Sequence, residues 1–312
     1  MITETNILVT GGGGFIGSHV CDELIRLGNT LTVIDDLSTG NIENLQGIIN
    51  DIDFYEEKIE TFNLNSLKDI GAIIHLAAQT SVPLSIEEFK DSSNSNISGC
   101  LNIIDYSKEN GIPLVYASSS AVYGNLPIGD DSSMNTDLIS PYAVDKYTME
   151  LYGKMANALY QLPNIGLRFF NVYGERQDPS SQYSGVISVF IDQMLNQQQV
   201  TIHGGHQTRD FIYVANIVES IIASLSLLKK RIIFENINVL TGVSTSINEL
   251  FKILAQHIDY NISPKYTDLL LGDPIESGGT IAKLQSTLML DPNVFKNLNE
   301  GLLRTIKSID KD

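Results

Sequence analysis

The chain has 312 residues, of which 43% are hydrophobic, and a formal net charge of −17. This length allows one large domain or two of ordinary size, and the hydrophobic content is that of a globular protein. The negative charge argues against nucleic acids and anionic membrane surfaces as partners. No apolar run approaches the 18 residues of a membrane-spanning helix, so no membrane segment is expected.

The N-terminus and the cysteines favour a cytoplasmic protein. Residues 1–6 are acidic and lead directly into a strand pattern, which is unlike the basic and apolar start of a signal peptide. Cys21 and Cys100 lie in apolar stretches with helical spacing. We therefore expect two buried, reduced thiols and no metal site.

Strands and helices alternate over the first 170 residues. Short β-rich apolar runs indicate buried strands, and longer runs with helical spacing end at glycines such as Gly28 and Gly111. The predicted strands are 6–10, 31–35, 73–76, 114–118 and 165–170, and the predicted helices are 18–27, 96–108 and 142–161. This alternation predicts an α/β fold with a doubly wound parallel sheet and helices on both faces.

The alternation weakens after Asn171, where Gly, Pro, Asn and Ser become more frequent. The strand-like run Phe211–Val214 and the helical pattern after it, to residue 235, indicate a return to the main sheet. We predict a main domain of residues 1–171 plus about 210–241. A smaller, discontinuous substrate-binding lobe would contain about 172–209 and 242–312.

A glycine cluster separates the first strand from the first helix. Gly11 would form the tight turn, Gly14 would let the backbone approach a pyrophosphate, and Gly17 would let helix and strand pack closely. The anion would rest on the free amides and the positive dipole end of the helix. The alternative is a flexible turn that binds nothing.

Two carboxylates at the end of the second strand favour the binding interpretation. Asp35 and Asp36 follow Gly17 by a little under 20 residues, the distance at which a carboxylate accepts hydrogen bonds from an adenosine ribose. A carboxylate repels a 2′-phosphate, and no Arg follows in residues 37–41 to bind one. The sequence therefore predicts a Rossmann-type domain that binds NAD rather than NADP.

Tyr142 and Lys146 form a candidate catalytic pair. Their spacing of four residues places both side chains on one face of a helix. An ammonium group favours the phenolate and lowers the pKa of a neighbouring tyrosine, which makes such a pair a usable general base or acid. The alternative is an aromatic residue beside a solvated lysine.

Motifs along nearly the whole chain give these features a common context. The chain resembles the extended short-chain dehydrogenase/reductase superfamily and, within it, NAD-dependent sugar-nucleotide epimerases of the UDP-glucose/UDP-N-acetylglucosamine 4-epimerase type. The segments that carry the resemblance are 10–19, 33–40, 75–79, 118–124, 142–146, 167–171, 207–211, 272–273 and 300–302.

The resemblance implies a catalytic role for Ser119, Tyr142 and Lys146. Ser119 would donate to the sugar 4-oxygen, and Lys146 would bind the nicotinamide ribose and hold Tyr142 as phenolate. Tyr142 would remove the proton of the 4-hydroxyl while C4 gives hydride to NAD. The 4-keto sugar would then turn, and hydride would return to its opposite face.

The resemblance also implies the binding residues and a homodimer formed through a helix bundle. The positions expected at the cofactor, besides Tyr142 and Lys146, are Gly11, Gly14, Phe15, Ile16, Gly17, Asp35, Asp36, Ser38, Thr39, Gly40, Lys58, Ile59, Leu76, Ala77, Ala78, Gln79, Ser95 and Phe170. Those expected at a UDP-sugar substrate are Ser81, Ser119, Ser120, Asn171, Val186, Thr201, Ile202, His203, Arg209, Asp273 and Ser277.

Residues beside Ser119 separate the possible reactions. Related 4,6-dehydratases carry Asp-Glu directly after this serine, because elimination of water needs a further acid and base, and decarboxylating relatives use a Glu nearby. This chain has Ser120 and Ala121 there. Epimerisation is therefore expected. The alternatives are a 4-keto reductase or dehydratase of the same superfamily, or a non-catalytic NAD-binding regulator.

Three positions bear on the ligands. Ser277 stands where a bulky Tyr excludes N-acetyl groups in the epimerases, so an N-acetylhexosamine is expected to fit. Leu270 replaces an Arg that usually binds the diphosphate, which leaves Arg209 and Asn171 for that role. Lys58 replaces an Asp that accepts from adenine. Because Lys has no acceptor, Ile59 and backbone carbonyls would serve instead.

Overall fold

The computed structural model describes residues 3–179, 185–269 and 273–310, and these form two compact units. Unit 1 comprises Met1–Val122, Leu138–Arg168 and Val218–Ile237. Unit 2 comprises Tyr123–Asp137, Phe169–Ile217 and Asn238–Asp312. Leu270 and Gly272 lie outside the described residues. No helix in the described ranges is long and apolar enough to cross a membrane.

A seven-stranded sheet forms the core of unit 1, in the order β10-β6-β5-β4-β1-β2-β3. Strands β1 to β5 pair in parallel. The inner residues of β1, β2, β4 and β5 are buried on both faces, as expected for a sheet covered by helices, whereas the edge strand β3 has no buried residue. The strands are β1 (Asn6–Thr10), β2 (Thr30–Asp35), β3 (Ile52–Glu56), β4 (Ile70–His75), β5 (Leu114–Ser119), β6 (Asn164–Phe169) and β10 (Phe234–Val239).

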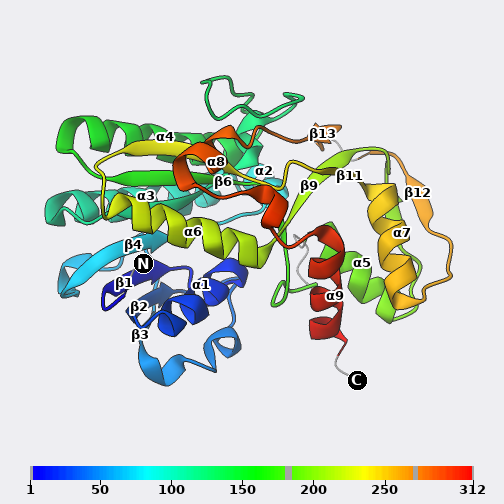
Figure 1. The fold of residues 1–312 in the computed structure, drawn as a ribbon, viewed down its shortest axis with the longest axis horizontal. Coiled ribbons are helices and arrows are strands. Elements are labelled where there is room, and N and C mark those ends of the chain that lie inside the picture. Colours follow the sequence, from blue (N-terminus) through cyan, green and yellow to red (C-terminus); the bar gives the residue numbers. More distant parts are fainter. Residues whose placement is uncertain (1–2, 180–184, 270–272, 311–312) are drawn as a thin grey trace. The chain divides into compact units, whose positions relative to one another are not determined.

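Helices connect these strands in both directions along the sheet. Crossovers between parallel strands are right-handed, so the helix between β1 and β2 covers one face and the helices after β4 and β5 cover the other. The last two lie side by side (Figure 1). The helices are α1 (Phe15–Arg26), α2 (Val82–Glu87), α3 (Phe89–Asn110), α4 (Pro141–Tyr160) and α6 (Val214–Leu228). The predicted doubly wound fold is confirmed.

Short 3₁₀ turns complete the chain path. They are η1 (Ile42–Leu45), η2 (Ile49–Asp51), η3 (Leu64–Ser66), η4 (Ser120–Tyr123) and η5 (Pro292–Val294). The turn η4 directly follows β5, so the chain leaves the sheet immediately after Ser119. The residue that the sequence places at the centre of the chemistry therefore lies at the carboxyl end of a central strand, where parallel sheets bind ligands.

Unit 2 combines short strands with a cluster of three helices. The helices α5 (Val186–Leu195), α7 (Ile247–Ile258) and α9 (Leu298–Ile309) pack against one another, and a Ser246–Glu249 capping box begins α7. The helix α8 (Ala282–Leu288) also belongs to this unit. The strands are β7 (Asn171–Tyr173), β8 (Thr201–His203), β9 (Thr208–Tyr213), β11 (Ser244–Ser246), β12 (Lys265–Thr267) and β13 (Glu276–Ser277).

The prediction that Phe211–Val214 rejoins the main sheet is wrong. Phe211–Tyr213 belong to β9, which pairs with β7, β11 and β13 in a small sheet, and Val214 begins α6. The chain returns to the main sheet only at β10, after α6. An apolar strand pattern shows that a strand is buried but does not show which neighbours bury it, and these neighbours are too short to be recognised in the sequence.

Candidate active site

The glycine turn of unit 1 has the geometry of an anion-binding loop. Gly11 has a φ of +72°, and a Cβ there would lie 2.6 Å from the backbone nitrogen of Ala77. A Cβ on Gly17 would lie 2.0 Å from the Gly11 oxygen. Gly14 caps α1 without a side-chain hydrogen bond, so no capping side chain covers the first amides of the helix. Only glycines allow this cradle, which fits the pyrophosphate of a dinucleotide.

The predicted ribose carboxylates lie beside this loop. Asp35 is buried and accepts hydrogen bonds from the amides of Gly13 and Leu37, both at 2.8 Å. Burial raises the pKa of Asp35, and the hydrogen bonds from those amides lower it. Asp36 accepts from the amide and hydroxyl of Ser38 at 3.1 and 2.6 Å. A carboxylate has about four acceptor sites, so both groups keep capacity for ribose hydroxyls.

The neighbouring predicted cofactor positions lie beside the glycine loop and in the first turn of α1. A Cβ on Gly40 would lie 3.0 Å from the carbonyl carbon of Gly13, so Thr39 and Gly40 pass directly beside the glycine loop. Phe15 and Ile16 form the first turn of α1. The structure thus brings together the residues that the sequence predicts at the phosphates and the ribose.

The remaining predicted cofactor residues of unit 1 follow β3 and β4. Leu76, Ala77, Ala78 and Gln79 are half-buried. The Gln79 amide donates to Asn96 Oδ1 at 2.8 Å, and the Gln79 side-chain oxygen accepts from the Ser81 amide at 2.5 Å.

The two positions expected at adenine differ in their exposure to solvent. Lys58 is exposed, whereas Ile59 is buried and its carbonyl accepts from Asn102 Nδ2 at 2.7 Å. The Ser95 hydroxyl donates to Glu60 at 3.2 Å. Only the backbone of the Lys58–Ile59 segment can accept hydrogen bonds, as the residue types require.

Ser119, Tyr142 and Lys146 meet at the junction of β5 and α4. The N-cap Ser140 accepts from the amide of Ala143 at 3.2 Å, and Pro141 begins the helix. Tyr142 lies in the first helical turn, with Ser119 beside its hydroxyl, and the Ser119 hydroxyl accepts from the Ala121 amide at 3.1 Å. Lys146 Nζ lies 5.7 Å from the centre of the Tyr142 ring.

The lysine is fixed by the strand below it. Lys146 Nζ donates to the backbone oxygen of Ala117 at 2.8 Å, two residues before Ser119. Only 2% of Lys146 and 8% of Tyr142 is exposed. Both candidate side chains are therefore shielded from solvent, and Lys146 is fixed by its bond to β5.

Burial controls the protonation of this pair. It raises the pKa of Tyr142 to about 12. The charge of Asp145 raises this pKa further, whereas the neighbouring Ser119 lowers it. Burial also lowers the pKa of Lys146 to about 8, which Cys100 and Asp145 oppose. The expected lowering of the Tyr142 pKa by Lys146 is not what the structure shows, because the cost of burying a phenolate is the larger effect.

Unit 2 brings three predicted substrate residues together. Strand β13 pairs with β9 so that Ser277 lies opposite Arg209. One guanidinium nitrogen of Arg209 donates to the backbone oxygen of Thr208 at 2.7 Å, and another pairs with Asp273. Side-chain exposure is 9% for Arg209 and 34% for Asp273. A buried cation with a partly exposed partner is suited to binding an anion.

The other predicted residues of unit 2 are more scattered. Asn171 begins β7, and its side-chain nitrogen is buried without a hydrogen-bond partner among the described residues. Phe170 is buried, with its ring centre 6.3 Å from that of Tyr123. Val186 begins α5. Thr201, Ile202 and His203 form β8, where Ile202 is buried and His203 pairs with Thr267 at 2.7 Å.

Sequence reasoning missed the polar residues that surround the catalytic pair. Asn96 Nδ2 donates to Asp145, directly before Lys146, at 3.1 Å. Glu150 forms a buried ion pair with Arg168. The spacing Tyr142, Lys146, Glu150 is a signal that could have identified Glu150, because residues four apart share a helix face.

The chain matches a known family over most of its length. The model of the NAD dependent epimerase/dehydratase family matches residues 7–239. The UDP-glucose 4-epimerase of Mycolicibacterium smegmatis is 32% identical over 309 residues, which is 96% of this chain and 97% of the relative. A UDP-N-acetyl-alpha-D-glucosaminuronate decarboxylase of Bacillus cytotoxicus is 31% identical over 80% of this chain and 79% of its own length.

Solved structures share the same fold. The UDP-glucose 4-epimerase of Thermotoga maritima, determined with UDP-glucose, has a TM-score of 0.91 and 35% identity over 98% of this chain and 99% of its own. The UDP-N-acetylglucosamine 4-epimerase of Methanobrevibacter ruminantium, determined with UDP-N-acetylmuramic acid, has a TM-score of 0.90 and 38% identity over 99% of both chains. The chain is similar to nucleotide-sugar enzymes over its full extent.

Proposed function

This chain belongs to the NAD dependent epimerase/dehydratase family, and from that premise we propose that it catalyses the 4-epimerisation of a UDP-hexose or UDP-N-acetylhexosamine. The predicted cofactor, NAD, is confirmed by the family. The observation that carries the proposal is the buried arrangement of Tyr142, Ser119 and Lys146 at the end of β5. It provides a proton acceptor, a hydroxyl donor and a fixed cation.

Tyr142 is proposed as the group that takes and returns the proton of the sugar 4-hydroxyl. Ser119 donates a hydrogen bond to the 4-oxygen. Lys146, held by the Ala117 oxygen, is proposed to bind the nicotinamide ribose and to oppose, by its charge, the burial that raises the pKa of Tyr142. The chemistry that NAD supplies when bound is hydride transfer to and from C4. The sugar is oxidised to a transient 4-keto form and reduced again, so there is no net redox change.

Arg209 and Asn171 are proposed to bind the substrate diphosphate. Both have buried donor groups, and a phosphate oxygen can accept from each. The carboxylate of Asp273 neutralises Arg209 until an anion replaces it. This local site would overcome the overall charge of −17, which repels an anionic substrate at long range.

Residue types favour epimerisation over decarboxylation, which remains an alternative because of the decarboxylase relative. The positions after Ser119 are Ser120 and Ala121, which have no carboxyl group. An elimination or decarboxylation that depends on an extra acid or base has no donor at these two positions. A sugar that leaves with the same mass as it entered is therefore the expected product.

Proton NMR of separate UDP-sugars incubated with the protein and NAD tests the proposal. Epimerisation predicts interconversion of the axial and equatorial 4-hydroxyl forms of UDP-glucose or UDP-N-acetylglucosamine at constant total sugar. Loss of carbon dioxide from UDP-glucuronic acid would establish a decarboxylase instead. Consumption of NADPH with a 4-keto sugar would establish a reductase. No turnover of any of these sugars by protein with bound NAD would support a non-catalytic NAD-binding protein.

A second copy of the chain is proposed to cover the outer face of α3 and α4. Val144 and Leu151 lie on the same exposed stripe of α4, and each is 45% exposed. Thr148, Tyr152 and Met155 line a shallow hollow beside Leu151. Burying such a stripe against its symmetry mate would form a helix bundle. Sedimentation velocity should give a dimer, and Leu151→Glu should give a monomer.

A cytoplasmic location is proposed from the cysteines. Cys21 and Cys100 are both free and buried, and burial raises the pKa of the Cys100 thiol to about 12. Neither thiol is arranged for a disulfide, which suits a reducing compartment.

A further inference from the structure

Glu150 extends the row of buried reactive side chains on α4. Tyr142, Lys146 and Glu150 are spaced by four residues, so they lie one above the other on the helix face that meets the sheet. Glu150 is 2% exposed, as is Lys146. The first two have roles in the proposed reaction, whereas Glu150 lies one further turn from the reacting end.

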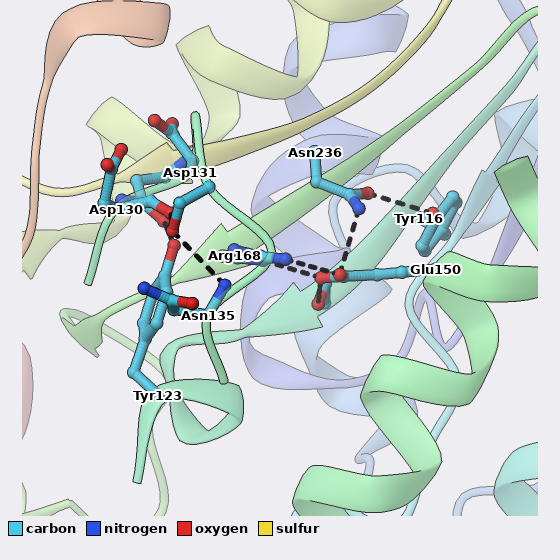
Figure 2. A network of polar contacts seen from close by, with 11 residues as sticks. Tyr116, Tyr123, Asp130, Asp131, Asn135, Glu150, Arg168 and Asn236 are labelled. Carbon is cyan, nitrogen blue, oxygen red and sulfur yellow. Dashed lines mark hydrogen bonds and ion pairs between the residues drawn. The ribbon is translucent and has the colours of Figure 1, made fainter. Parts of the chain in front are cut away.

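All the acceptor capacity of Glu150 is used by residues on strands. Arg168 donates from Nε to Oε1 at 2.8 Å and from Nη2 to Oε2 at 2.6 Å. Ser118 Oγ donates to Oε1 at 2.5 Å, and Asn236 Nδ2 donates to Oε2 at 2.9 Å. Figure 2 shows the Glu150 carboxylate meeting Arg168 and Asn236. One side chain of α4 is thereby joined to β5, β6 and β10.

A second ring of contacts fixes the partners themselves. Tyr116, on β5, donates from its hydroxyl to Asn236 Oδ1 at 3.3 Å (Figure 2). The Arg168 side chain is only 4% exposed. The carboxylate therefore has a single position, set by four donors of fixed direction, and helix α4 cannot rotate or slide without breaking several of these bonds.

Stability alone does not explain a buried ion pair. Taking two charges out of water costs much of what their attraction returns, and well-packed apolar residues of similar volume often stabilise a protein as well or better. Apolar packing, however, does not fix the relative orientation of the two side chains. A bidentate guanidinium–carboxylate pair fixes both distance and angle.

The bonds from α4 to β5 lie next to the proposed catalytic residues, so their geometry bears on the reaction. Lys146 donates to the backbone oxygen of Ala117, Glu150 accepts from Ser118, and Ser119 lies beside Tyr142. Three consecutive residues of β5 thus contact three successive turns of α4. The strand and the helix are thus joined at several points beside the place where the proposed proton transfer occurs.

We propose that Glu150, through its ion pair with Arg168, is a positioning residue that fixes the register of α4 on β5 and so holds Tyr142 and Lys146 in place relative to Ser119. It acts through the helix and touches neither substrate nor cofactor. The inference rests on the proposed function for its kinetic consequence, whereas its structural consequence can be measured in the absence of turnover.

The test replaces both charges together. The variant Glu150→Leu/Arg168→Met keeps the volume of the pair and leaves no single buried charge. It should unfold at a temperature close to that of the wild type or higher. Its kcat should fall about 10- to 100-fold at nearly unchanged KM, because a displacement of the order of 1 Å in reacting groups has that effect. A crystal structure should show the Lys146–Ala117 bond lengthened or broken.

Two further variants separate positioning from stability. Ser118→Ala removes one donor and keeps the ion pair, and its kcat should fall a few-fold. Ser107→Ala removes a buried hydroxyl on α3 that donates to the Ile112 oxygen at 2.5 Å, far from this network in the sequence. It should lower the unfolding temperature without changing kcat.

The results for these variants support or overturn the positioning role of Glu150. Wild-type kcat in a folded double variant, or an intact Lys146–Ala117 bond in its crystal structure, would overturn the inference. If the double variant does not fold, unchanged kcat in Ser118→Ala would do so. If wild-type protein epimerises no sugar, the proposed function fails, but the change in the Lys146–Ala117 bond still supports or overturns the positioning role.

Discussion

The charged groups of the two units are held in different ways. In unit 1, Lys146 and Glu150 are almost completely buried, and their partners belong to the strands below them. In unit 2, Arg209 is paired with Asp273, a third of which is exposed. The partners in unit 1 can be exchanged only by moving a helix, whereas a ligand can displace Asp273. Substitutions in unit 1 should therefore affect kcat, and those in unit 2 should affect KM.

Removal of the Tyr142 hydroxyl should have the largest effect. Tyr142→Phe keeps the buried ring and removes the proposed acid and base, and such a group contributes about 10²- to 10⁴-fold to a rate. We expect kcat for epimerisation to fall about 10³-fold while KM stays within a few-fold. Initial rates by NMR or a coupled assay measure this. The NAD content of the variant serves as its control, and retention of full kcat would contradict the mechanism.

Neutralising Arg209 should have the next largest effect and should fall on KM. In Arg209→Met a charge-assisted hydrogen bond to phosphate is lost, which is worth about 1.5–3 kcal/mol, or roughly 10- to 100-fold. We expect KM for the UDP-sugar to rise by this factor and kcat to change little.

The matched control for this prediction is Asp273→Asn. It keeps the shape of the side chain and removes the charge that competes with the ligand, so KM should fall or stay unchanged. A loss of kcat in Arg209→Met at constant KM would show that unit 2 contributes to the chemical step, and the distinction between the units would not hold.

The burial of His75 inside unit 1 should make the free energy of unfolding depend on pH. His75 is buried, and its pKa is lowered to about 3 by burial first and by the charge of Lys146 second. In the unfolded chain its pKa is near 6.5. Below that pH the unfolded chain binds a proton that the folded chain does not, so the free energy of unfolding decreases as pH falls.

The expected decrease from this residue is about 2 kcal/mol between pH 6.5 and 5, at about 1.4 kcal/mol for each pH unit. Urea unfolding of the wild type and of His75→Gln at both pH values measures it. The variant should lose this share of the pH dependence even if it is less stable at neutral pH. Equal pH dependence in the two proteins would show that the folded chain protonates His75 readily.

The sequence predicts five strands of unit 1, β1, β2, β4, β5 and β6, because most of their residues are buried. It does not predict β3 and β10, which are less buried. Runs such as Asn6–Thr10 and Leu114–Ser119 are rich in Val, Ile and Leu and end at glycines or polar residues. Helix starts were less visible. Helix α3 begins at Phe89, seven residues before the predicted start, because its first turns are polar and carry little apolar periodicity.

The proposed catalytic residues could likewise be placed by local pattern, since Ser119 ends a strand and Tyr142 and Lys146 lie in the first turns of a helix. The hydrogen-bond network around Glu150 could not be predicted from the sequence. Glu150 pairs with Arg168 across 18 residues and with Asn236 across 86, and no local periodicity encodes such partners. The same holds for β9, whose neighbours are strands of two or three residues.

The smallest effect is expected where unit 2 meets the sugar. Ser277 lies opposite Arg209 in the register of β13 and β9, so a larger side chain there would occupy space near the proposed diphosphate site. We expect Ser277→Tyr to lower kcat/KM for UDP-N-acetylglucosamine relative to UDP-glucose by about 10-fold, the scale on which a pocket discriminates a small extra group.

The control for this substitution is Ser277→Ala, which is no larger than serine and should keep the wild-type ratio of the two kcat/KM values. Competition between the two sugars in one reaction gives that ratio directly. A wild type that strongly prefers UDP-glucose, or a tyrosine variant with an unchanged ratio, would show that Ser277 does not select the sugar. In either case the kcat of the preferred sugar should stay near its wild-type value, because the residues proposed to carry out the chemistry are held in unit 1.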